Sequence, residues 1–91
     1  MLQKNAYGIA AFRSRQQVMR FDSALRRAGL TSDIVSTPRD VAVGCGLSAA
    51  FDLKDTQAVL NVYRQTRPGN LIGFYRVDQA PGQRPAVSPL V

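Results

Sequence analysis

The chain contains no histidine, glutamate or tryptophan, and it has a single cysteine, Cys45. A zinc site takes about four cysteine, histidine or carboxylate ligands at set spacings, and one cysteine with six scattered aspartates does not supply them. Without histidine, neither a Ser–His–Asp triad nor a Cys–His pair can form. A lone cysteine closes no internal disulfide, which agrees with a reducing compartment. Covalent chemistry, if there is any, therefore falls to Cys45, and we expect neither a metal nor another cofactor.

Long apolar runs are also missing. No run approaches the roughly 18 residues that cross a bilayer, and the first residues, MLQKNAYGIAAF, lack the pattern of a signal peptide. We therefore expect a soluble, cytoplasmic protein that does not associate with membranes. The length of 91 residues with 45% hydrophobic content predicts one small domain, over residues 1–77. Residues 78–91 hold three prolines and predict a flexible C-terminal tail.

Positive charge is what the chain has in excess. The formal net charge is +6, and the isoelectric point near 10.5 favours anionic partners. Arg13, Arg20 and Arg27 recur every seven residues and are predicted to lie on one helix face. This face is either simply solvated or a docking surface for an acidic protein or a nucleic acid.

The order of apolar segments predicts a mixed fold. Strand-like runs occupy residues 7–12, 31–36, 47–51 and 71–77. Between the first two, Ser14 and Gln17 have the spacing of a capping box, and Gly29 is typical of a helix C-terminus.

Val18, Phe21, Leu25 and Ala28 would form the buried face of that first helix. Asp52 would cap a second helix. The resulting order, βαββαβ, predicts an α+β, ferredoxin-like sandwich with two helices on one face of a four-stranded antiparallel sheet. The other face would be open or used for association, and a homodimer is one such use.

The loop before the third strand carries the lone thiol. Gly44 and Gly46 flank Cys45, so little side-chain bulk surrounds it, and their amides could stabilise an anion. Arg39 lies six residues upstream, where it could lower the pKa of the thiol. The alternative is that Cys45 is a small buried hydrophobe, as free cysteines often are. Residue type and spacing leave both interpretations open.

This loop resembles that of a small bacterial family of selenium/sulfur carrier-like proteins. The chain shares its pattern at seven positions: Thr37, Pro38, Arg39, Asp40, Cys45, Gly46 and Leu47. It departs at Ser36, where proline is common, and at Gly44, where serine is common, and neither change removes a thiol or a charge. Thr37 and Pro38 would shape the loop.

The resemblance implies a carrier that holds sulfur or selenium as a persulfide or perselenide on Cys45, stabilised by Arg39, Gly44 and Gly46. It would be a carrier or transferase-like thiol protein rather than a free-standing enzyme. The implied partners are a cysteine desulfurase or TusA-like carrier as donor and a selenophosphate synthetase as acceptor.

Two other classes of function compete with the carrier. Basic ferredoxin-like domains also bind RNA, but the third strand here, LSAAF, lacks the aromatic pattern of those modules. Phe51 and Tyr75 remain as aromatics that could stack on bases. The third class is a binding module for a protein or small ligand that uses no thiol chemistry.

Overall fold

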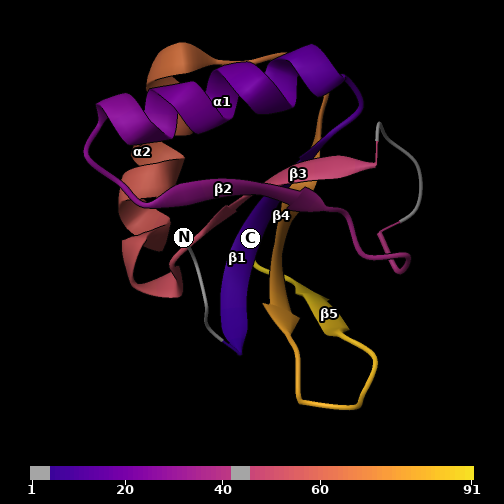
Figure 1. Ribbon diagram of the computed structural model, residues 1–91. Coiled ribbons are helices and arrows are strands. Elements are labelled where there is room, and N and C mark those ends of the chain that lie inside the picture. Colours follow the sequence, from indigo (N-terminus) through magenta and orange to yellow (C-terminus); the bar gives the residue numbers. More distant parts are fainter. Residues whose placement is uncertain (1–4, 42–45) are drawn as a thin grey trace.

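The computed structural model describes residues 5–41 and 46–91. Its helices and strands alternate in the predicted order, with one addition at the C-terminal end (Figure 1). The elements are β1 (Ala6–Phe12), α1 (Arg15–Arg27), β2 (Ser32–Ser36), β3 (Leu47–Phe51), the short 3-10 helix η1 (Leu53–Asp55), α2 (Thr56–Thr66), β4 (Leu71–Asp78) and β5 (Ala86–Pro89).

The strands form one antiparallel sheet in the order β2-β3-β1-β4-β5. Each helix connects two strands that run the same way with a third strand between them, as in the split βαβ arrangement. The α+β class and the two helices are as predicted. The count of four strands was wrong, because Ala86–Pro89 pairs with β4 through four residues from Tyr75 to Asp78. The segment predicted as a tail thus adds a fifth strand next to β4, at the edge of the sheet opposite β2 (Figure 1).

Helix α1 begins where the sequence predicts, but the contact that caps its N-terminus is not the predicted one. Ser14 is extended, and its carbonyl oxygen accepts the N–H groups of Gln17 and Val18, whereas its side chain makes no capping hydrogen bond. The predicted capping box is therefore not formed. Gly29 follows the helix with a φ of +83°, a conformation that glycine adopts without strain. Ala28, predicted on the buried face, is exposed because the helix has already ended at Arg27.

The second helix is entered through η1. The Asp52 carboxylate accepts the N–H of Lys54 and so caps η1 rather than α2 itself. Arg67 then ends α2 in a left-handed conformation with a φ of 45°. The residues Arg67-Pro68-Gly69-Asn70, a composition typical of turns, bring the chain back into β4.

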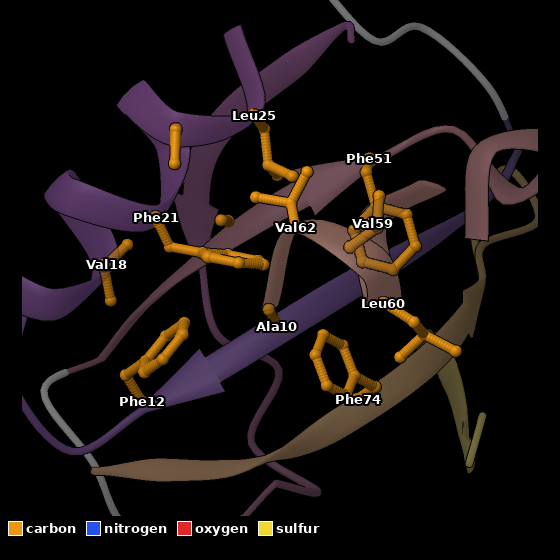
Figure 2. Close-up of a cluster of buried hydrophobic side chains, with 12 residues drawn as sticks. Ala10, Phe12, Val18, Phe21, Leu25, Phe51, Val59, Leu60, Val62 and Phe74 are labelled. Carbon is orange, nitrogen blue, oxygen red and sulfur yellow. The ribbon is translucent and has the colours of Figure 1, made fainter. Parts of the chain in front are cut away.

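Both helices pack on the same face of the sheet. Figure 2 shows their apolar side chains meeting those of β1, β3 and β4. The Phe21 ring lies 5.5 Å from the Phe12 ring and 6.4 Å from that of Phe74, and Tyr63 lies edge-on to Phe74 at 5.4 Å. Tilted and edge-to-face aromatic pairs of this kind stabilise a core beyond the burial of their area.

The opposite face of the sheet also holds buried apolar residues. A second cluster of buried residues lies there, contributed by strands and by one residue of the β2–β3 loop: Ile9, Ala11, Val41, Ala50 and Val77. Tyr7, Val35, Ile72, Tyr75 and Val87 pack against it. Within residues 5–41 and 46–91, no helix is both long and apolar enough to span a membrane.

Candidate functional site

The β2–β3 loop is the candidate site, and the structure describes its two ends. Cys45 and Gly44 lie outside the described residues. Gly46 is exposed with a φ of +84°, and its carbonyl oxygen accepts the N–H of Thr37 at 2.9 Å. This hydrogen bond closes the base of the loop directly beside Cys45.

The first half of the loop is anchored to the sheet. The Thr37 hydroxyl lies 2.7 Å from the hydroxyl of Ser48, a fully buried residue of β3. The Val41 N–H donates to the Pro38 carbonyl at 3.0 Å, and the Val41 side chain packs into the second cluster. These contacts join Thr37 to β3 and Pro38 to Val41.

Arg39 is exposed at the tip of this anchored half, beside a pocket of about 490 Å³. The other wall of the pocket comes from the end of β4 and the β4–β5 connection. Seven of its nine described lining residues have polar side chains: Tyr7, Ser36, Thr37, Arg39, Asp40, Gln79 and Arg84. We call this the loop pocket.

One ion pair joins the two walls of the loop pocket. The Arg84 guanidinium lies 3.5 Å from the Asp40 carboxylate, and both side chains are largely exposed, at 82% and 54%. None of the ion pairs observed between described residues involves Arg39. Sequence reasoning missed Arg84 and Gln79 because the segment that carries them was predicted as a tail.

A second pocket, of about 510 Å³, lies between α1 and the turn after α2. Arg20, Arg27 and Arg67 line it, and none of its described lining residues is acidic. Met19, half exposed, and Pro68 add apolar surface. We call this the basic groove.

The predicted arginine stripe is only partly formed. Arg13 precedes α1 and does not line the basic groove, so it cannot share a helix face with Arg20 and Arg27. Arg26 does not line the basic groove either, because its guanidinium donates hydrogen bonds to the Asp22 carboxylate and the Ser32 carbonyl. Arg67 takes the place of Arg13; its position in a predicted turn gave no sign that it would face α1.

The aromatic residues considered for base stacking are differently placed. Phe51 is fully buried on the helix side of the sheet, so it has no surface to offer a base. Tyr75 packs against the second cluster on the other face. The two rings therefore do not form a stacking platform.

The described residues form a small α+β fold with an anchored, arginine-bearing turn in the β2–β3 loop, and the single cysteine belongs to the same loop in the sequence. The sequence model of one family, described as "Putative Se/S carrier protein-like", matches residues 7–70. That match covers more than half of the chain and includes the whole β2–β3 loop, and the chain belongs to this family. No curated protein and no solved structure matches it.

Proposed function

We propose that the protein carries sulfur or selenium as a persulfide or perselenide on Cys45. The observation that carries the proposal is the family match, which includes the loop with the only thiol of the chain. The closed base of the loop, the exposed Arg39 and the loop pocket support it. Together they provide a cationic setting on the surface for an anionic group.

The transfer would proceed in two balanced steps. The Cys45 thiolate attacks the terminal sulfur of a donor persulfide, the donor S–S bond breaks, and the donor leaves as a thiolate. In the second step an acceptor nucleophile attacks the terminal sulfur, and the Cys45 thiolate is released. Selenium would follow the same path through a perselenide. A thiol that is both nucleophile and leaving group needs no resolving cysteine, and the chain has none.

Arg39 would stabilise the anionic persulfide through charge-assisted hydrogen bonds. Gly44 and Gly46 would leave space around the thiol and offer backbone N–H groups. The donors and acceptors implied by the resemblance, a cysteine desulfurase or TusA-like carrier and a selenophosphate synthetase, are the partners to test first.

Intact-mass analysis tests the carrier chemistry. The purified protein, incubated with inorganic polysulfide, should gain one sulfur atom that a reductant removes. Cys45→Ser should gain none. Arg39→Ala should load more slowly, while Arg64→Ala, which removes an exposed arginine of α2, should load at the parent rate. A wild-type protein that gains no sulfur and reacts slowly with a small alkylating reagent would overturn the proposal.

We further propose that the basic groove docks the protein donor or acceptor. Three arginines without a lining carboxylate favour an acidic surface, and the exposed Met19 offers that partner an apolar contact. Electrostatic complementarity of this kind acts mainly on the rate of association.

A comparison of donors isolates this docking role. Arg20→Glu with Arg27→Glu should slow loading from a protein donor by about tenfold or more at low salt. Loading from polysulfide, which needs no docking, should stay unchanged. Lys54→Glu paired with Arg64→Glu makes the same change of charge outside the groove-lining set and serves as the control. Equal slowing by both pairs would show that only net charge matters.

A further inference from the structure

We propose that the loop pocket binds the carboxylate or oxyanion group of a small anionic molecule, with Arg39 and Arg84 as its ligands. The proposal deepens the function proposed above and rests on it for one point only, that the bound molecule delivers or receives the carried atom. The binding itself does not require the thiol.

Charge is the first argument. Two arginines, one from the loop and one from the β4–β5 connection, line one pocket, and Asp40 is the only acid among its described lining residues. Asp40 engages Arg84 at 3.5 Å, so one positive charge is left without an opposing carboxylate in the lining. Guanidinium groups recognise carboxylates and tetrahedral oxyanions by paired, charge-assisted hydrogen bonds.

Size and neutral donors are the second argument. The pocket measures about 490 Å³, within the roughly 300–1,000 Å³ of small-molecule sites. Tyr7 and Gln79 belong to the same lining, and a hydroxyl and an amide are side-chain groups that can donate to further oxygens of the molecule.

The position of Arg84 is set by the sheet. Backbone hydrogen bonds fix both ends of the connection that carries it: the Gln79 N–H donates to the Asn5 carbonyl at 2.7 Å, and β5 pairs with β4. Within the connection, the Gln83 N–H donates to the Ala80 carbonyl at 3.1 Å. Arg84 and Gln79 lie beyond the family match, which ends at residue 70. The β4–β5 connection thus contributes one of the two proposed arginine ligands of the pocket.

Asp40 allows a test of the direction in which anion affinity changes. It competes with an incoming anion for Arg84, so its removal should strengthen anion binding rather than weaken it. Asp40→Asn keeps the size of the side chain and removes its charge.

The experiment is an NMR titration of the full chain at constant ionic strength, made up with chloride. Sodium sulfate is the inorganic probe. S-methylglutathione is the second probe, because it has carboxylates and no free thiol to exchange with Cys45. We expect at least one probe to cause saturable shifts of the Arg39 and Arg84 Nε–H signals. Sulfate alone would assign an inorganic oxyanion, and S-methylglutathione alone a small-molecule carboxylate.

The variants decide between a site and diffuse attraction. Arg39→Ala or Arg84→Ala should each weaken binding about three- to tenfold, Asp40→Asn should tighten it, and Arg64→Ala should leave it unchanged. No saturable shift from either probe, or an equal loss in Arg64→Ala, would overturn the proposal. Cys45→Ser should bind the probes like the parent, so failure of anion binding and failure of sulfur loading are separate results.

Discussion

The two faces of the sheet are filled by different kinds of residue. On the helix face, large rings interlock, with Phe12, Phe21 and Phe51 each at most 1% exposed. On the other face the strands contribute smaller residues, such as Ala11 and Ala50, and a loop residue helps to cover them. Stability is therefore concentrated on the helix face, and the candidate site belongs to the face that contributes less to it.

The largest effect should come from the helix face. Phe21→Ala removes the ring that contacts Phe12, Tyr63 and Phe74, and it should lower the free energy of unfolding by about 3–5 kcal/mol. Urea denaturation followed by circular dichroism measures this loss. A loss below about 1 kcal/mol would contradict the assignment of stability to this face.

Gly8 tests how tightly that face is packed. It pairs with Phe51 across β1 and β3, and a Cβ at this position would overlap the Phe51 ring. Gly8→Ala should therefore cost about 1–3 kcal/mol. Gly69→Ala is the matched control, since its Cβ would meet nothing closer than 4.0 Å, and its midpoint in urea should stay close to that of the parent.

Thr37 tests how the loop is held. Thr37→Val keeps the shape of the side chain but removes the hydroxyl that lies 2.7 Å from the buried Ser48 hydroxyl. We expect a loss of about 1 kcal/mol. The Thr37 amide, which donates to Gly46, should also exchange its hydrogen faster. Unchanged exchange there would show that the base of the loop does not depend on Ser48.

The smallest effect on stability should come from Arg84. Its ion pair with Asp40 is exposed on both sides, and exposed pairs contribute about 0–1 kcal/mol. Arg84→Ala should thus leave the thermal midpoint nearly unchanged while weakening anion binding. A marked drop in the midpoint would show that Arg84 stabilises the folded protein, which would contradict a role confined to anion binding.

The sequence predicted most of the helix face. Apolar spacing on α1 located Val18, Phe21 and Leu25 correctly, because a helix must bury one continuous stripe. It did not foresee the capping of α1, where the Ser14 carbonyl rather than its hydroxyl makes the contact. The fifth strand was missed because prolines and polar residues around Ala86–Pro89 obscure the alternation that marks a strand.

The site was predicted less completely, for a physical reason. Arg39, Thr37 and Pro38 are neighbours in the chain, so a local motif reveals them together. Arg84 reaches the same pocket only because β4 and β5 pair, and Arg67 reaches the basic groove only because α2 turns back on α1. Contacts made by tertiary structure leave no local trace in a single sequence.

The last strand also sets how this sheet ends. The Leu90 N–H donates inward to the Phe74 carbonyl, and successive N–H groups of a strand alternate in direction. The outward positions within β5 are therefore Val87 and Pro89, and neither Pro89 nor Pro85, which directly precedes the strand, has an N–H to donate. A neighbouring molecule that tried to add a strand here would find Val87 as the single donor. The prolines thus protect this margin of the sheet against edge-to-edge aggregation.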